Sequence, residues 1–252
     1  PLTAFTVREL GADAGVMVTA SHNPPQDNGY KVYLGGRVVE GDGQGVQIVP
    51  PFDSEIAAAI AAAPPADQVP RDAANGPGKV EEVDTRERYL SRIQERASEG
   101  PRDLRITLTP MHGVGGDLAL KALEAVGFTE VELVAEQAQP DPNFPTVTFP
   151  NPEEPGALDC AFAAAQETRS DIILALDPDA DRCAVAIPTD SGWRQLTGDE
   201  TSALLGEYLA RDGGVLANSV VSSRFLGRIA QARGAQWRTT LTGFKWIART
   251  PN

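Results

Sequence analysis

Short apolar runs alternate with longer amphipathic stretches along most of the chain. The short runs are typical of buried strands, and the longer stretches without internal Gly or Pro are typical of helices. Strands are predicted at 15–20, 31–34, 105–109, 131–134, 171–176, 183–187, 215–221 and 236–241. Helices are predicted at 53–63, 85–98, 117–126, 158–168 and 223–233, and a further helix carries Asp199 and Glu200 in its first turn. This order predicts an α/β fold built from repeated units.

An alanine- and proline-rich stretch at 57–78, which includes Pro64-Pro65, Pro70 and Asn75-Gly-Pro-Gly, interrupts the alternation. Such sequences favour turns and linkers, so we predict a domain boundary there. A predicted hairpin at 189–195 separates the second unit from the third. The expected result is three tandem mixed α/β domains at 1–80, 81–190 and 191–252. Because the chain begins with Pro1 and the third unit stops before its sheet closes, we expect both ends to be cut.

Charge and composition narrow the possible classes of function. The 252 residues carry a formal net charge of -13, which repels phosphate backbones and argues against nucleic acid as a partner. No apolar run approaches the ~20 residues of a membrane-spanning helix, so no membrane association is expected. Cys160 and Cys183 lack the spacing of a metal site or a disulfide framework. Such cysteine usage fits a reducing compartment, so we expect a cytoplasmic protein. Because the net charge is negative, an anionic substrate would need a local basic site.

Three carboxylates follow a predicted buried strand in the segment Asp177-Pro-Asp179-Ala-Asp181-Arg182. In an extended loop, alternate positions send these side chains to one side, where their like charges repel. A hard divalent cation with oxygen ligands, such as Mg²⁺, would hold them together. A calcium EF-hand opens in the same way, but Arg182 occupies its glycine position and Pro188 its last glutamate position. A solvated turn remains the alternative.

Ser21 follows the first predicted strand, in the segment Thr-Ala-Ser-His-Asn-Pro at 19–24. A side chain that carries a phosphoryl group must be exposed, rigidly held and surrounded by hydrogen-bond donors. The neighbouring residues meet these needs: His22 and Asn23 as donors, Pro24-Pro25 for stiffness, and an Asn28-Gly29 turn that returns Lys31 to the loop. A serine hydrolase is disfavoured because no Gly-x-Ser-x-Gly elbow surrounds Ser21. Composition alone leaves a simple turn equally open.

Three further segments carry weaker signals. His112-Gly-Val-Gly-Gly116 invites a dinucleotide-binding interpretation, but its glycines miss the fingerprint spacing, so backbone geometry and helix packing explain them better. The Pro-, Asp- and Asn-rich connection at 139–156 is long enough to be functional, although its residues do not indicate a role. Lys245, in Thr242-Gly-Phe-Lys-Trp, is either a surface lysine or a sugar contact.

The serine loop, the acidic loop and the Thr242-Gly-Phe-Lys245 segment, in this order and at these separations, resemble the α-D-phosphohexomutase superfamily. Three ordered motifs are far more specific than any one alone. Asp27-Asn-Gly-Tyr-Lys-Val-Tyr, Met111-His-Gly-Val-Gly and Pro150-Asn-Pro-Glu-Glu are most similar to the phosphoglucomutase and phosphopentomutase branch. The resemblance implies that the chain holds about two and a half of the four family domains.

The resemblance also implies a role for individual residues. Ser21 would be the phosphoserine, and Asp177, Asp179 and Asp181 would bind Mg²⁺ together with its phosphate. His22 would hydrogen-bond the phosphoserine, Lys31 would be the general acid/base, and Arg182 would be a further catalytic residue close to the phosphoserine and the sugar. Substrate contacts are expected from Asn23, Lys31, Arg182 and Lys245.

The implied reaction interconverts sugar 1-phosphates and 6-phosphates through a bisphosphate, with mannose or glucose phosphates as substrates and a glucose 1,6-bisphosphate-type activator. The alternatives are a phosphopentomutase, which would form the 5-phosphate, and a non-catalytic module that binds metal and sugar phosphate. A nucleotide-dependent dehydrogenase is a distant third. We expect a monomer or homodimer, and we expect the chain as numbered to be nearly inactive because the family's sugar-binding loop and fourth domain are absent from it.

Overall fold

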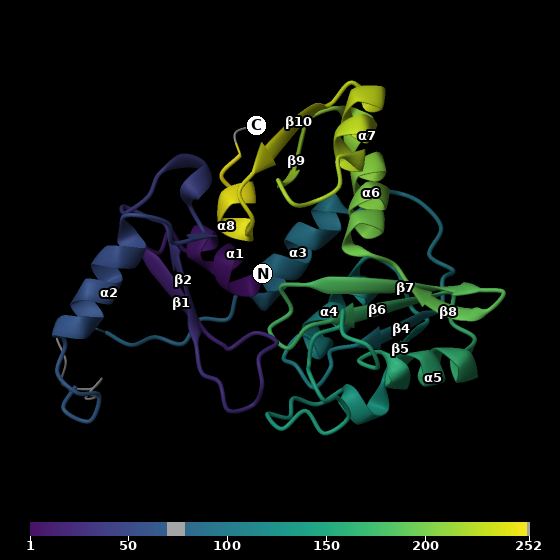
Figure 1. Cartoon of the computed structure of the whole chain (residues 1–252), viewed down its shortest axis with the longest axis horizontal. Helices are drawn as coiled ribbons and strands as arrows, with labels where there is room; N and C mark the ends of the chain where they lie inside the picture. The colour runs from purple at the N-terminus through teal and green to yellow at the C-terminus, as the bar shows by residue number, and fades with distance from the viewer. Residues whose placement is uncertain (70–78, 251–252) are drawn as a thin grey trace.

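The computed structural model describes residues 1–69 and 79–250 and confirms the predicted α/β fold (Figure 1). The part of the predicted linker that contains Pro70 and Asn75-Gly-Pro-Gly lies outside the described residues. None of the helices in the described ranges combines the length and the apolar character that a membrane crossing requires.

The first unit is a small antiparallel sheet with strand order β1-β2-β3, made of β1 (Ala14–Val18), β2 (Tyr30–Leu34) and β3 (Val46–Gln47). Helix α1 (Leu2–Glu9) packs on it through the buried Val7, and η1 (Gly41–Gly43) precedes β3. Helix α2 (Phe52–Ala62) follows at the left edge of Figure 1. The sequence patterns missed α1 and β3, and β1 ends earlier than predicted.

The second unit is a five-stranded mixed sheet in the order β5-β4-β6-β7-β8. Its central strands β4 and β6 are parallel, as are β4 and β5, whereas β7 and β8 form the predicted hairpin. The strands are β4 (Ile106–Thr109), β5 (Val131–Leu133), β6 (Ile172–Leu176), β7 (Cys183–Thr189) and β8 (Gly192–Gln195). The helical segments are α3 (Arg86–Arg96), α4 (Gly116–Ala125), η2 (Ala135–Gln137) and α5 (Asp159–Thr168).

Successive side chains of β6 pack on opposite faces of this sheet. Ile173 packs against the alanines of α5, which lies below the sheet in Figure 1, while Leu174 and Leu176 point to the opposite side. There they line an apolar cavity of about 440 Å³ with residues of α3 and α4. Because β6 is covered on both faces, all of its residues are apolar, as in the run at 172–176 of the sequence.

The third unit consists of the parallel strands β9 (Val215–Ser219) and β10 (Gln236–Thr240), joined by α7 (Phe225–Arg233). Helix α6 (Gly198–Leu209) packs beside α7 and starts with a capping box, in which Thr197 and Glu200 satisfy each other's backbone N–H groups. It continues into η3 (Ala210–Asp212), and α8 (Phe244–Ile247) follows β10. Strand β9 ends earlier than predicted because the chain turns at Ser219, whose carbonyl accepts from Ser222 N at 3.1 Å.

The first unit contacts both of the others. The Thr6 and Thr85 hydroxyls lie 2.6 Å apart at the start of α3, where Phe5 also meets the Tyr89 ring edge-on at 5.2 Å. Next to α8, the Arg249 guanidinium donates to the Gln47 carbonyl of β3 at 2.9 Å. Contacts between α1 and α3 and between α8 and β3 thereby join segments that are far apart in the sequence (Figure 1).

Candidate active site

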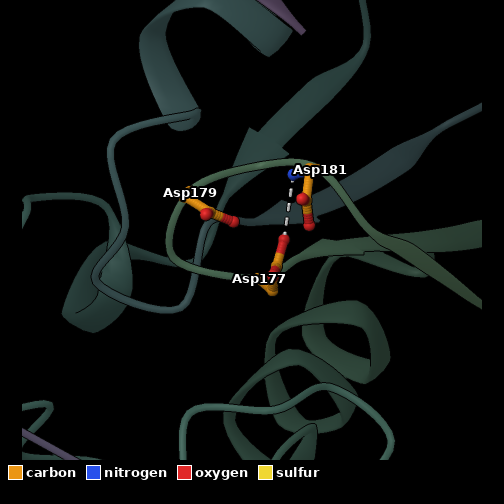
Figure 2. A group of neighbouring side chains, drawn as sticks. All are labelled: Asp177, Asp179 and Asp181. Carbon is orange, nitrogen blue, oxygen red and sulfur yellow. Dashed lines mark hydrogen bonds between the residues drawn. The ribbon is translucent and has the colours of Figure 1, made fainter. Parts of the chain in front are cut away.

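The acidic loop connects β6 to β7, and Asp177 determines its shape. Its fully buried carboxylate accepts the backbone N–H groups of Asp181 at 3.1 Å and Arg182 at 3.0 Å, and its carbonyl accepts that of Ala180. Ala180 adopts the left-handed conformation with φ 56°, which closes the turn. As Figure 2 shows, the side chains of Asp177, Asp179 and Asp181 converge, and oxygens from all three lie within 4.8 Å of one another.

The environment of this cluster favours a cation. Burial raises the pKa of Asp177 to about 6, with a further contribution from the charges of Asp179 and Asp181, although the backbone N–H of Arg182 opposes the shift. One oxygen of Asp179, Oδ1, is buried and has no hydrogen-bond partner among the described residues. A buried acceptor without a donor is costly. A divalent metal ion bound by oxygen ligands would satisfy it and offset the repulsion, so the three aspartates fit such an ion.

Lys31 reaches the same cluster from β2. Its ammonium lies 2.7 Å from Asp179 Oδ2 and 2.5 Å from Asp181 Oδ2. Burial alone would lower the pKa of Lys31, but the hydrogen bonds to the two carboxylates outweigh it and raise the pKa above its usual value. Burial would raise the pKa of Asp179, but the hydrogen bond from Lys31 outweighs this effect, so the pKa of Asp179 lies below its usual value. Lys31 is therefore a cation in this arrangement.

Ser21 also reaches the acidic loop. It adopts a left-handed backbone conformation with φ 58°, which is uncommon for a residue other than glycine and is often found at functional sites. Its hydroxyl donates to Asp177 Oδ2 over 3.3 Å and lies 3.2 Å from His22 Nδ1. Its backbone N–H donates to Thr19 Oγ1 at 2.8 Å, and Thr19 Oγ1 donates in turn to Asp179 Oδ2 at 3.0 Å.

Thr19 thus links the serine loop to the acidic loop, a role that the sequence did not reveal although the residue belongs to the same motif. The turn at Gly29 holds this link in place, because the Gly29 carbonyl accepts the Thr19 N–H at 3.0 Å. A Cβ on Gly29 would lie only 2.8 Å from the Thr19 carbonyl oxygen. The backbone there therefore requires glycine.

Two other predicted residues lie beside this centre. Burial lowers the pKa of His22, and the positive charge of nearby Arg182 lowers it further. The Arg182 side chain is exposed, and its backbone N–H helps to hold Asp177. The exposed Asn23 donates to Asp27 Oδ2 at 3.1 Å within its own loop, so its amide is engaged away from the carboxylate cluster.

Lys245 does not contact the aspartate cluster in the described residues. Its ammonium lies over the ring of Trp246, 5.9 Å from the centroid, and its carbonyl accepts from Arg249. Within residues 1–69 and 79–250, no hydrogen bond or ion pair joins Lys245 to the aspartates or to Ser21. Its sugar-contacting role remains a prediction.

The glycine loop at 112–116, which leads into α4, packs against the acidic loop. Val114 N donates to the Pro178 carbonyl at 2.9 Å, and a Cβ on Gly113 would lie 2.5 Å from Pro178 Cα. A Cβ on Gly115 would lie 2.6 Å from Ala180 Cβ. This close approach supports the packing interpretation of these glycines, because a side chain at either position would push the acidic loop away.

A substitution at Gly113 should therefore destabilise the protein. We expect Gly113→Ala to lower the free energy of unfolding by about 1–3 kcal/mol, as overpacking of a close contact does, measured by urea denaturation. Gly198→Ala is the matched control, because a Cβ there meets Glu153 Oε1 only at 3.9 Å and its φ needs no glycine. Equal stabilities of the two variants would show that the loops are not tightly packed.

Comparison with known proteins accounts for this arrangement. Family models for phosphoglucomutase/phosphomannomutase alpha/beta/alpha domains I, II and III match residues 1–66, 87–192 and 197–250, in that order. The chain belongs to the α-D-phosphohexomutase superfamily. A "Probable phosphomannomutase" from Haemophilus influenzae is 45% identical to this superfamily member over 256 residues, covering 99% of the chain and 51% of that protein.

Other members of the superfamily carry different names. Human "Phosphopentomutase" is 39% identical over 269 residues, covering 98% of the chain and 43% of that protein. A crystal structure of a phosphoglucomutase/phosphomannomutase family protein from Burkholderia thailandensis superposes with a TM-score of 0.68 and 28% identity, covering 93% of the chain and 46% of that structure. The chain thus spans about half the length of the relatives it matches.

Proposed function

We propose that the protein is a cytoplasmic phosphosugar mutase that carries a phosphoryl group on Ser21 and works with Mg²⁺ held by Asp177, Asp179 and Asp181. The observation that carries this proposal is the position of the Ser21 hydroxyl, within hydrogen-bonding range of both Asp177 and His22. A nucleophile beside three converging carboxylates suits phosphoryl transfer, which depends mainly on positioning and charge neutralisation.

Ser21, His22 and Lys31 have different roles in the proposed phosphoryl transfer. Ser21 is held by Thr19 with its hydroxyl toward the acidic loop, and His22 offers a hydrogen bond to the phosphoserine. In the transfer, the bond between phosphorus and Ser21 Oγ breaks, a bond from phosphorus to a sugar hydroxyl oxygen forms, and the hydroxyl proton passes to a base. Lys31 is our candidate for the general acid/base: as the ammonium ion of this arrangement it can donate a proton, and it must first release that proton before it can accept the one from the hydroxyl. The bound metal would neutralise charge on the transferring phosphoryl group.

The resulting sugar bisphosphate then returns its other phosphate to Ser21 in the reverse of the same step. A cycle of this kind is started by a bisphosphate activator of the glucose 1,6-bisphosphate type. One relative, 35% identical to the chain, is named "Glucose 1,6-bisphosphate synthase", which supports bisphosphate chemistry at sites of this kind.

Two substrate classes have support. The relative with 45% identity is named a phosphomannomutase, which favours hexose phosphates. Relatives at 39% identity are named phosphopentomutase and phosphoribomutase, which favours pentose phosphates as the second candidate. Arg182, Asn23 and Lys245 are proposed substrate contacts.

Turnover measurements with the full-length protein test the proposal. Glucose, mannose and ribose 1-phosphates are supplied separately with Mg²⁺ and glucose 1,6-bisphosphate, and formation of the 6- or 5-phosphate is followed. We expect at least one conversion, dependent on the bisphosphate. Absence of every conversion by a folded, metal-loaded protein would favour a non-catalytic module that binds metal and sugar phosphate.

A further inference from the structure

The long connection between η2 and α5, residues 139–156, is anchored at both ends of a short segment around Phe149. On one side, the Thr146 hydroxyl lies 2.9 Å from His112 Nε2 and accepts a hydrogen bond from Gln137 Nε2 at 2.9 Å. His112 and Gln137 are both buried. The next residue, Val147, packs against the apolar cluster that contains Met111 and Leu158.

On the other side, the backbone is held just as firmly. Pro150 and Pro152 are fully buried, and the Pro152 carbonyl accepts from the Gln195 side chain of β8 at 2.8 Å. The Phe149 carbonyl accepts the Asn151 N–H at 2.8 Å. A segment fixed on both sides in this way holds its side chain in one place, although the connection has no regular secondary structure.

The half-buried Phe149 ring lies against His22. The two ring centroids are 6.0 Å apart and the planes make an angle of 73°, which is the edge-to-face arrangement that aromatic rings favour. The same imidazole places Nδ1 3.2 Å from Ser21 Oγ. Phe149 belongs to the second unit and His22 to the first, so the contact crosses between them.

We propose that Phe149 is a positioning residue that holds the His22 imidazole with Nδ1 toward Ser21. A histidine on a surface loop can rotate about two side-chain bonds and can exchange its ring proton between Nδ1 and Nε2. The rigid Phe149 ring restricts that rotation, so one face of the imidazole and one nitrogen remain available to Ser21. The proposal rests on the role assigned to Ser21 above, and it gives the connection a function that its sequence did not indicate.

Phe149→Leu tests this assignment, because leucine keeps an apolar side chain but removes the flat ring. In the full-length, metal-loaded enzyme we expect kcat to fall by about 10- to 100-fold, the range expected when a reacting group is misplaced slightly, with KM nearly unchanged. Phe149→Tyr restores the ring and should restore kcat. Phe162→Leu is the matched control, since Phe162 packs in the core of the second unit rather than against His22.

A nuclear magnetic resonance measurement separates this inference from the proposed function. The ring ¹⁵N signals of His22 are assigned in the full-length protein by their absence from a His22→Asn variant, and those of His112 in the same way. At fixed pH we expect distinct Nδ1 and Nε2 shifts for His22 in the wild type and in Phe162→Leu, and averaged shifts in Phe149→Leu. Unchanged His22 shifts in Phe149→Leu would overturn the proposal even if the protein turned over no sugar phosphate. Averaged shifts with unchanged kcat would also overturn it.

Discussion

Replacement of Ser21 by alanine should abolish phosphorylation of the protein and reduce mutase turnover by a factor of about 10³ or more, the scale of loss when a covalent nucleophile is removed. The reason is geometric: Ser21 Oγ is the hydroxyl that lies within hydrogen-bonding range of both Asp177 and His22. Intact-protein mass spectrometry after incubation with glucose 1,6-bisphosphate should find one added phosphoryl group in the wild type and none in Ser21→Ala. Peptide mapping should place it on Ser21.

Ser191→Ala provides the control, because Ser191 is an exposed residue of the turn between β7 and β8. It should retain both phosphorylation and turnover. The stability of Ser21→Ala should differ from the wild type by less than about 1 kcal/mol, since its hydroxyl makes only long contacts. A phosphoryl group that persists in a folded Ser21→Ala variant would refute the assignment of the carrier.

Strand β6 of the second unit could be predicted from the sequence because burial on both faces makes it a continuous apolar run. Helix α1 was missed for a physical reason. Its sequence, Leu-Thr-Ala-Phe-Thr-Val-Arg-Glu, contains several β-branched residues with modest helix propensity. It is stabilised by packing on β1 and β2, through Val7, rather than by a local pattern. Strand β3 is too short to leave any periodic signal.

The candidate site could be predicted in its parts but not in its assembly. The spacing of Asp177, Asp179 and Asp181 indicated a shared cation, and the serine loop was visible as a motif. The bond from Ser21 to Asp177 spans 156 positions in the chain, and only tertiary packing creates it. Phe149 lies in a connection without periodicity, so its contact with His22 could not be inferred from the sequence.

Asp179→Asn should weaken Mg²⁺ binding at least about tenfold, because even residues that merely support metal ligands typically contribute 10- to 100-fold in affinity. The amide is a poorer ligand for a hard cation than the carboxylate, and Asp179 Oδ1 is buried without a hydrogen-bond partner in the described residues. Isothermal titration calorimetry with Mg²⁺ measures the affinity directly. The rate of Ser21 phosphotransfer should fall in parallel.

Two further variants make this prediction sharper. Asp27→Asn, which removes an exposed carboxylate of the serine loop bonded to Asn23, should leave the Mg²⁺ affinity unchanged. Lys31→Met should act in the opposite direction to Asp179→Asn and raise the affinity, because the Lys31 ammonium occupies Asp179 Oδ2 and Asp181 Oδ2, which the metal ion would otherwise contact. If Asp179→Asn and Asp27→Asn bound Mg²⁺ equally well, the ion would have to lie elsewhere. A weaker affinity in Lys31→Met would mean that the lysine supports the ion rather than competing with it.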